Sequence, residues 1–217
     1  MFHGQISKPK AEIHATEFTA ALQRVPDATV FPVLPHDADI TVAPDGSHEH
    51  YIKRPNMAVY ELYNEDDFLA RVLLAEALIM ERLARHPHPN IVRYHGVRVR
   101  RGRVTGLILD KHQSTLLDYV KSGLDLDEEI FLTTLDAAVA HLHSLGLAHN
   151  DINPENIMIT FEKLPILIDF GSCQEFGKRV LTQGTPGWVD AVDGRSGKEH
   201  DIYALARMRD WFKDPWF

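Results

Sequence analysis

The chain has 217 residues, of which 44% are apolar and 25% are charged. This composition is that of an ordinary globular protein, and the length suffices for one domain or two small lobes with a buried core. A formal net charge of −8 argues against nucleic acid as a partner. We expect no membrane-spanning helix and no secretory signal, and the single cysteine fits a cytoplasmic or nuclear location.

The N-terminal region has little regular pattern. Residues 1–35 contain several prolines and no sustained period, so we expect an irregular arm with at most one short helix, near residues 15–24. Residues 40–42 and 48–54 predict two strands that form a hairpin through a tight turn.

The second of these strands contains His48 and His50, which alternate and therefore share a face. This pair is a weak zinc signal, because no third ligand lies close in the sequence. Solvated side chains on a hairpin are the simpler interpretation.

A long helix follows over residues 65–85, with apolar side chains on one stripe. Glu76 lies on that stripe, whereas Glu81 lies well off it. Because an unpaired buried carboxylate is strongly destabilising, Glu76 needs a cationic partner.

The rest of the chain predicts a second hairpin and then mostly helices. The hairpin spans residues 91–109 and turns at Arg101-Gly102. Helices are predicted over 115–121, 127–145 and 200–211, and short strands over 157–159 and 166–168.

Three side chains in the second half of the chain suit chemistry on a magnesium–nucleotide complex. Asp151 lies in a loop, Asn156 follows five residues later, and Asp169 comes after a short strand. Mg²⁺ prefers carboxylate and amide oxygens and fills its remaining positions with phosphate oxygens and water. A separate carboxylate beside an acceptor hydroxyl can take its proton.

The segments that contain these residues resemble two motifs of the eukaryotic protein kinases. Residues 149–156 (His-Asn-Asp-Ile-Asn-Pro-Glu-Asn) resemble the catalytic loop, and Asp169-Phe170-Gly171 resembles the metal-binding motif. The resemblance covers nearly all of the chain after about residue 40. Further segments match in the correct order, namely 86–92, 107–110, 184–188 and 201–205. More narrowly, the chain is similar to the short protein-kinase-like proteins of filamentous fungi.

This resemblance implies an α+β, two-lobed kinase-like fold over residues 36–217. The first lobe (36–110) would hold a small antiparallel sheet with one regulatory helix. The second lobe (111–217) would be mostly helical and truncated, since no Ala-Pro-Glu follows Trp188 and the last helices of a complete kinase domain have no counterpart.

The resemblance also implies a role for each matching residue, with ATP and Mg²⁺ as cofactors. Asp151 would be the catalytic base, and Asn156 and Asp169 would be the magnesium ligands. Lys53 would hold the α/β-phosphates and pair with Glu76. The remaining expected site residues are Thr185, near Asp151; Asn153, beside the transferred phosphate; and Asp110, at the nucleotide-binding hinge between the lobes.

The sequence also departs from the kinase pattern. No Gly-x-Gly-x-x-Gly precedes Lys53, so another loop must cover the phosphates or nucleotide binding is weak. Asn150 replaces the arginine that pairs with a phosphorylated activation segment. Asn153 replaces a lysine, which removes one cation from the field around the transferred phosphate.

Three functions therefore remain open. Retention of Lys53, Glu76, Asp151, Asn156 and Asp169 favours an active Ser/Thr-type kinase that transfers the γ-phosphate of Mg-ATP to proteins. The missing glycine loop favours a pseudokinase, a binding module with little or no catalysis. A choline- or aminoglycoside-type small-molecule kinase is the third, disfavoured by the Asp-Phe-Gly motif.

Two smaller expectations concern partners and reactivity. The expected partners are ATP and an unidentified protein substrate. The aromatic residues at the C-terminal end, Trp211, Phe212, Trp216 and Phe217, either cap the lobe or form a dimer or partner interface, and capping is favoured. Cys173 is expected to be a small buried residue rather than a reactive thiol.

Overall fold

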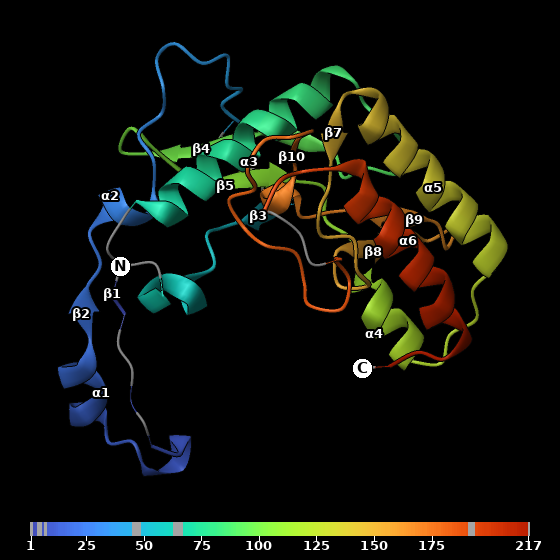
Figure 1. Ribbon diagram of the computed structural model, residues 1–217. Coiled ribbons are helices and arrows are strands. Elements are labelled where there is room, and N and C mark those ends of the chain that lie inside the picture. Colours follow the sequence, from blue (N-terminus) through green and yellow to red (C-terminus); the bar gives the residue numbers. More distant parts are fainter. Residues whose placement is uncertain are drawn as a thin grey trace.

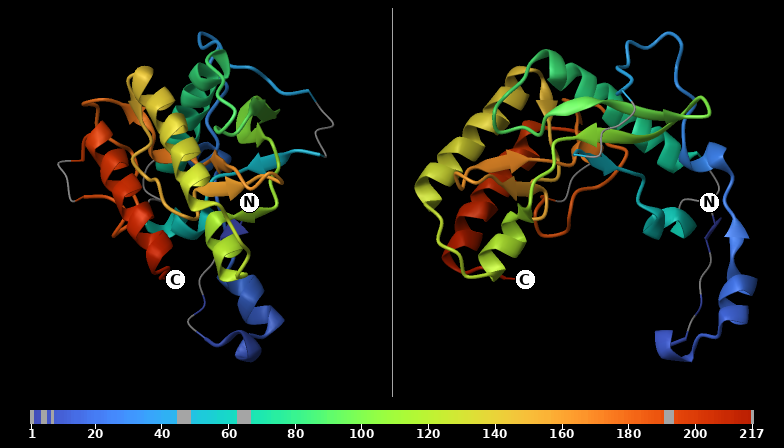
Figure 2. Two further views of the ribbon diagram at one scale, coloured as in Figure 1. Left: turned by 90° about the vertical axis from the view of Figure 1, so that its right-hand side faces the viewer. Right: turned by 180° about the vertical axis from the view of Figure 1, so that it is seen from behind.

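The structure is a computed structural model that describes residues 2–3, 6, 8–44, 49–62, 67–190 and 194–216 (Figure 1). It confirms the expected two-lobed α+β kinase-like fold. A small sheet with helix α3 forms one lobe, and helices α4, α5 and α6 dominate the other (Figure 2). No helix in the described part of the chain is both long and apolar enough to span a membrane.

The sheet of the first lobe (here the N-lobe) has three antiparallel strands in the order β3-β5-β4. They are β3 (Tyr51–Lys53), β4 (Tyr94–Arg100) and β5 (Arg103–Leu109). Strands β4 and β5 form the second predicted hairpin. Its turn places Arg101 at φ 52° and Gly102 at φ 71°, the left-handed pair that a two-residue hairpin loop requires.

Helix α3 (Phe68–Arg85) packs its apolar stripe against this sheet, with Leu73, Ala77 and Met80 in the main core. The side chain of Glu81, which lies off this stripe, is buried as well. Tyr94 Oη donates to Glu81 Oε1 at 2.9 Å, and the backbone N–H of Thr41 donates to the same oxygen at 2.6 Å. The segment around residue 41 therefore covers a face of the helix that periodicity alone assigns to solvent.

The hairpin predicted over residues 40–54 was also wrong. Val42 forms an isolated parallel bridge with Val97 on β4, whereas β3 pairs with β5. Strand propensity identifies extended segments but not their partners, and the long apolar strand β5 offers β3 more contacts than the short segment at 40–42. Residues 45–48, which include His48 and most of the predicted turn, lie outside the described residues.

The N-terminal region contains more than the single short helix expected. Strands β1 (Phe2–His3) and β2 (Gln23–Arg24) pair with each other, and α1 (Ala15–Ala21) is followed by α2 (Asp27–Val30). Short 3₁₀ turns lie at Lys10–Glu12 and Met57–Leu62. Val25 and Val30 are buried with Leu69 of α3, so burial against α3 orders a segment in which local propensity is weak.

The second lobe (here the C-lobe) follows the sequence prediction closely. Helix α4 (Leu116–Lys121) begins at an N-cap formed by Thr115, and α5 (Glu128–Ser144) begins at one formed by Asp127. Helix α6 spans Lys198–Lys213. The strands are β6 (Ser114–Thr115), β8 (Ile157–Ile159) and β9 (Pro165–Leu167) in one sheet, and β7 (Leu147–Ala148) with β10 (Gln174–Glu175) in another.

The aromatic residues near the C-terminal end pack within the chain. Trp211 is fully buried, and its Nε1 donates to the backbone oxygen of Trp216 at 2.9 Å. The ring of Trp216 stacks on Trp188, with the ring centroids 5.6 Å apart. These contacts are those expected of a cap on the lobe. Phe217 lies outside the described residues.

Candidate active site

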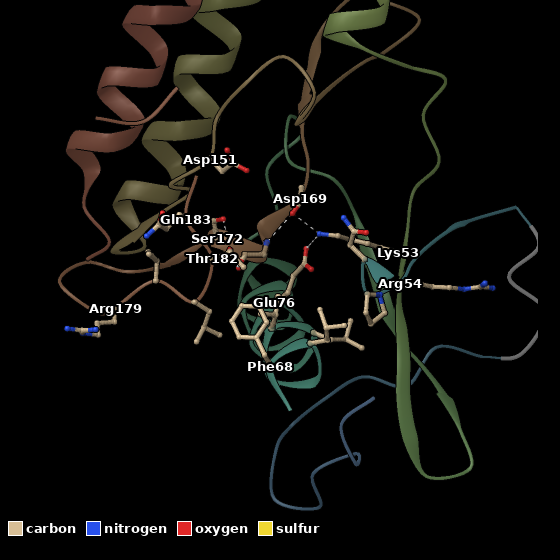
Figure 3. A pocket seen from close by; sticks show the side chains of 18 of the residues that line it. Lys53, Arg54, Phe68, Glu76, Asp151, Asp169, Ser172, Arg179, Thr182 and Gln183 are labelled. Atoms are coloured by element: carbon tan, nitrogen blue, oxygen red, sulfur yellow. Dashed lines mark hydrogen bonds and ion pairs between the residues drawn. The ribbon is translucent and has the colours of Figure 1, made fainter. Parts of the chain in front are cut away.

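Three charged side chains meet between the two lobes. Lys53 Nζ, from β3, lies 2.5 Å from Glu76 Oε1 on α3 and 2.7 Å from Asp169 Oδ1 (Figure 3). The Glu76 side chain is only 5% exposed, so it has the cationic partner that its place on the apolar stripe requires. The contact expected between Lys53 and Glu76 is therefore present.

The backbone around Asp169 fixes this arrangement. Asp169 adopts a left-handed conformation (φ 59°) and accepts a hydrogen bond from Gly171 N at 3.2 Å, at the start of the 3₁₀ turn Phe170–Ser172. The backbone N–H of Phe170 donates to Glu76 Oε1 at 3.0 Å. Glu76 thus connects helix α3 to Lys53 and to the Asp-Phe-Gly backbone at once.

The three groups shift one another's pKa values. Burial raises the pKa of Glu76, which Asp169 reinforces and Lys53 opposes. Burial alone would lower the pKa of Lys53, but the charges of Glu76 and Asp169 outweigh it and raise that pKa. Burial would raise the pKa of Asp169, but Lys53 outweighs it and holds this pKa below its usual value. Lys53 is therefore a cation and Asp169 an anion at neutral pH.

A second group of polar side chains surrounds Asp151. Its Oδ1 accepts from Thr185 N at 2.7 Å and from Asn153 Nδ2 at 3.0 Å, and its Oδ2 accepts from Asn156 Nδ2 at 3.0 Å. Asn153 Nδ2 also donates to Thr185 Oγ1 at 3.1 Å. The amide of Asn153 therefore links Asp151 to Thr185 without carrying a charge.

A buried carboxylate on helix α6 fixes the backbone of the catalytic loop that contains Asp151. Asp201, on α6, is fully buried and accepts from the backbone N–H of His149 at 2.9 Å and from that of Asn150 at 2.8 Å. His143 Nε2 lies 2.9 Å from Asp201 Oδ2. Asp201 opens the segment 201–205, which matches the kinase pattern, whereas His143 lies on a side of α5 that periodicity does not single out.

The side chain of Asn150 holds the segment that follows Asp-Phe-Gly. Its Nδ2 donates to the backbone oxygens of Ala148 and Ser172, both at 2.9 Å, and lies 3.0 Å from Ser196 Oγ. Gly184 approaches the same residue so closely that a Cβ there would lie 2.3 Å from Asn150 O. A glycine is therefore required at position 184.

A cavity of about 670 Å³ connects the two polar groups. Lys53, Glu76, Asp151 and Asp169 all line it, and α3 and residues 179–183 form its other walls (Figure 3). Two cations, Arg54 and Arg179, also line it, and the sequence analysis missed Arg54 because this residue belongs to no motif. A cavity with three carboxylates and a half-buried lysine can hold a polyanion together with a cation.

Asp110 does not lie with these residues. Its side chain is directed to His95, with Oδ1 2.6 Å from Nε2, and its backbone N–H donates to Arg93 O at 3.0 Å. Asp110 directly follows β5, where the chain leads into the C-lobe.

The oxygen donors suit Mg²⁺. The Asp169 side chain is 44% exposed and anionic, and because Asn156 Nδ2 donates to Asp151, Asn156 Oδ1 is the atom that a cation would take. One carboxylate and one amide oxygen, with phosphate and water completing the shell, form a typical magnesium environment. The residues present therefore fit the ion.

Sequence comparisons with known proteins point to the same kind of enzyme as the residues of this site. The protein kinase domain family matches residues 53–208. MAP kinase kinase kinase win1 of Schizosaccharomyces pombe is 30% identical over 128 residues, which cover 56% of this chain and 9% of that protein. Serine/threonine-protein kinase PknG of Mycolicibacterium smegmatis is 35% identical over 144 residues, which cover 61% of this chain and 19% of that protein.

A third relative, serine/threonine-protein kinase SSK22 of Saccharomyces cerevisiae, is 33% identical over 149 residues, which cover 54% of this chain and 11% of that protein. The chain thus spans less than a fifth of the length of each of these relatives. The match of the family itself covers most of the chain. The chain belongs to the protein kinase family.

Proposed function

We propose that this protein is an active protein kinase of the Ser/Thr type, which transfers the γ-phosphate of Mg-ATP to hydroxyl groups of proteins. The observation that carries the proposal is that one cavity holds both the Lys53–Glu76–Asp169 triad and the hydrogen-bonded Asp151. Magnesium and ATP, when bound, supply the electrophilic phosphorus and neutralise part of its charge.

Lys53 holds and orients the phosphates. Its ammonium group lies between two carboxylates, and Glu76 is the buried one, so Glu76 would keep the lysine in place with Asp169 engaged by a metal ion. Lys53 would then be free to bind phosphate oxygens, and Asp169 and Asn156 would hold the magnesium ion, which neutralises part of the phosphate charge.

Asp151 receives the proton of the acceptor hydroxyl. The hydroxyl oxygen forms a bond to the γ-phosphorus, the bond from that phosphorus to the oxygen it shares with the β-phosphate breaks, and ADP leaves. The proton passes to a carboxylate oxygen of Asp151. The hydrogen bonds from Thr185 N and Asn156 Nδ2 support this role, because they fix the orientation of the carboxylate.

Asn153 weakens this machinery without abolishing it. In the kinases that the chain resembles, a lysine at this position adds a positive charge beside the transferred phosphate. Asn153 keeps the geometric link between Asp151 and Thr185 but supplies no charge. We therefore expect slow turnover.

A second candidate function is a nucleotide-binding scaffold without phosphate transfer. One observation favours it: in the described residues the N-lobe sheet has only three strands, and no glycine-rich hairpin precedes β3. Loss of the amides that cover the phosphates would leave the γ-phosphate poorly positioned.

Two measurements on the purified full chain separate these functions. Calorimetric titration with ATP, with and without Mg²⁺, measures binding, and transfer of labelled γ-phosphate to the protein itself and to a basic carrier protein measures catalysis. We expect both, with transfer lost in Asp151→Asn and with both binding and transfer weakened in Asp169→Asn. Asp125→Asn, in an exposed loop of the C-lobe, is the matched control.

The outcomes are distinct. Binding without transfer in the wild-type chain would establish the scaffold function instead. Transfer that survives in Asp151→Asn would remove the proposed base.

A further inference from the structure

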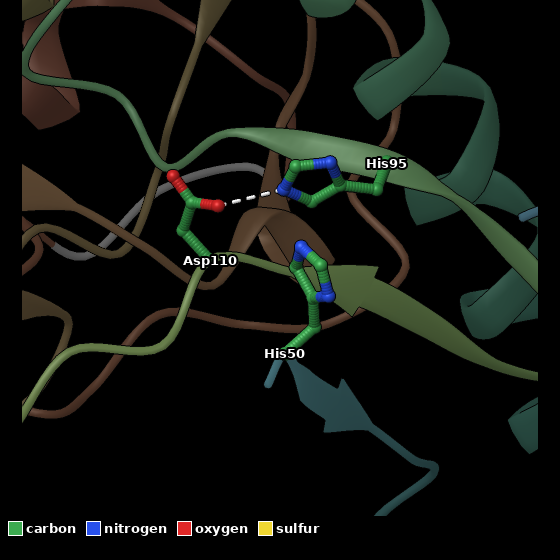
Figure 4. A group of neighbouring side chains, drawn as sticks. All are labelled: His50, His95 and Asp110. Atoms are coloured by element: carbon green, nitrogen blue, oxygen red, sulfur yellow. Dashed lines mark hydrogen bonds and ion pairs between the residues drawn. The ribbon is translucent and has the colours of Figure 1, made fainter. Parts of the chain in front are cut away.

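Three side chains converge at a second place, at the end of the N-lobe sheet. His50 precedes β3, His95 lies on β4, and Asp110 follows β5 (Figure 4). The ligand atoms that they offer all lie within 4.8 Å of one another. His95 Nε2 is 2.6 Å from Asp110 Oδ1, and the rings of His50 and His95 meet edge to face with centroids 4.2 Å apart.

The register of the sheet explains this convergence. Tyr51 pairs with Leu109, so the residue before Tyr51 lies opposite the residue after Leu109, which places His50 beside Asp110. The pairing of β4 with β5 shifts between Tyr94 and Gly96, and this irregularity presents His95 toward the same place. The cluster is therefore positioned by three separate strands rather than by one mobile loop.

One atom of the cluster has no hydrogen-bond partner in the described part of the chain. His50 Nδ1 is buried, yet nothing among the described residues bonds to it. Buried polar atoms are almost always paired, and a ring nitrogen that does not donate offers a lone pair. Figure 4 shows a ring nitrogen of His50 directed toward His95 and Asp110, which is the position that a ligand to a shared ion needs.

The donor set selects the ligand. Two imidazole nitrogens and one carboxylate oxygen suit Zn²⁺ or a neighbouring transition-metal ion, whereas Mg²⁺ and Ca²⁺ prefer oxygen alone. Four-coordinate zinc keeps its ligand atoms about 3.4 Å apart. The His95–Asp110 contact is shorter than this, and all three ligand atoms lie within 4.8 Å of one another, so small side-chain rotations would bring them to the spacing that zinc needs.

We propose that His50, His95 and Asp110 form a binding site for a divalent transition-metal ion, Zn²⁺ being the expected one, with the fourth position filled by water. The ion ties the start of β3, the middle of the sheet and the end of β5 together. Lys53 lies on β3 three residues after His50, so the site also restrains the strand that carries the active-site lysine. The proposal does not depend on phosphate transfer.

Metal binding to the metal-free full chain tests this directly. Titration of Zn²⁺ against a chromophoric chelator should give one tight site per chain. Binding should weaken at least about tenfold in His50→Gln and in His95→Gln, since each removes one of three ligands. His36→Gln, at an exposed histidine remote in sequence, is the matched control and should bind like the wild type.

The melting temperature and the Co²⁺ absorption spectrum provide two independent tests. Zn²⁺ should raise the Tm of the wild type and of His36→Gln but not of the two cluster variants, because only the folded site binds the ion. Co²⁺ in place of Zn²⁺ should give the intense visible absorption of a four-coordinate site. If a cluster variant fails to fold, the Co²⁺ spectrum of the wild type decides alone. A six-coordinate spectrum, or equal Zn²⁺ affinity in the wild type and His50→Gln, would show that the three side chains form only a hydrogen-bonded cluster.

Discussion

The side-chain amide of Asn150 lies 2.9 Å from the backbone oxygen of Ser172, and this hydrogen bond joins the catalytic loop to the segment after Asp-Phe-Gly. Both residues are buried. In the kinases that the chain resembles, an arginine at this position pairs with a phosphorylated residue of the activation segment. Here a neutral amide already holds the main chain, so the order of this segment needs no added charge.

The first prediction concerns the ion pair of Lys53 and Glu76. Glu76→Gln should lower kcat/KM for ATP at least about tenfold, because it removes the charge that holds the Lys53 ammonium group in place. Lys53→Met should lower kcat/KM more, because it removes the ammonium group itself. Steady-state kinetics with varied ATP measure this. Glu81→Gln is the control, since Glu81 is buried on the same helix but bonds Tyr94 and Thr41 instead.

Glu81→Gln should lower the Tm while kcat/KM stays within about twofold of the wild type. Wild-type kinetics in Glu76→Gln would contradict the proposed role of the pair. Equal kinetic losses in Glu76→Gln and Glu81→Gln would show that general destabilisation, not phosphate positioning, is the cause.

The second prediction concerns Asn153. Asn153→Ala removes the donor shared by Asp151 and Thr185, so kcat should fall about tenfold or more while KM for ATP changes little. Asn153→Lys restores a cation beside the transferred phosphate and should raise kcat above the wild type. Rates measured at saturating ATP check both. A kcat for Asn153→Ala equal to that of the wild type would mean that the bridge has no catalytic value.

The third prediction concerns the close approach of Gly184 to the catalytic loop. In Gly184→Ala the new Cβ would clash with Asn150 O, a backbone atom that cannot move without the loop, so both activity and Tm should drop. Gly197→Ala is the matched control, because its Cβ meets only the end of the Glu199 side chain, which can turn away. Equal melting temperatures for the two variants would argue against a tight contact at position 184.

The fourth prediction concerns Cys173. Burial raises the pKa of this thiol well above its ordinary value, and the negative charges of Asp201 and Glu76 add to the shift. The reactive species is the thiolate, so the folded protein should react slowly with thiol reagents at neutral pH and faster only as the pH rises or the chain unfolds. Timed labelling with and without denaturant measures this. Fast labelling that ATP blocks would show that the thiol is open to the nucleotide site.

The parts of the fold that the sequence predicts are those that a local pattern defines. The apolar stripe of α3 and the N-caps of α4 and α5 depend on neighbours a few residues away, so periodicity and capping suffice. The ion pair of Glu76 is also predictable from the sequence, because a carboxylate on a buried apolar stripe needs a cationic partner.

The parts that it does not predict depend on distant contacts. The partner of the segment at 40–42, the burial of Glu81 and the support of Asp201 by His143 each need two elements far apart in the chain. A single sequence contains the residues but not their pairing. The joining of His50 to His95 and Asp110 is of the same kind, since register across three strands creates it.

The last prediction is that activity does not depend on phosphorylation of the segment between Asp169 and Gly184. Its two hydroxyl-bearing residues, Ser172 and Thr182, already bond each other through their side-chain oxygens at 2.7 Å, and Thr182 Oγ1 also donates to Gly171 O at 3.2 Å. Ser172 is buried, so a kinase would have to open this segment to reach it. A phosphate on either residue would break these bonds.

Phosphatase treatment of the purified chain should therefore leave kcat within about threefold of the untreated value, since Asn150 offers a phosphate no positive charge. Thr182→Ala loses both of these hydrogen bonds and should lower the Tm without a large loss of kcat. Thr182→Val is the matched control, because it keeps the shape of the side chain and cannot be phosphorylated. Lys178 pairs with Glu175 at 2.6 Å on an exposed surface and would gain little from a new phosphate, because exposed ion pairs are weak. A loss of about tenfold or more after phosphatase treatment, matched in both Thr182 variants, would show that phosphorylation of Thr182 switches the enzyme on.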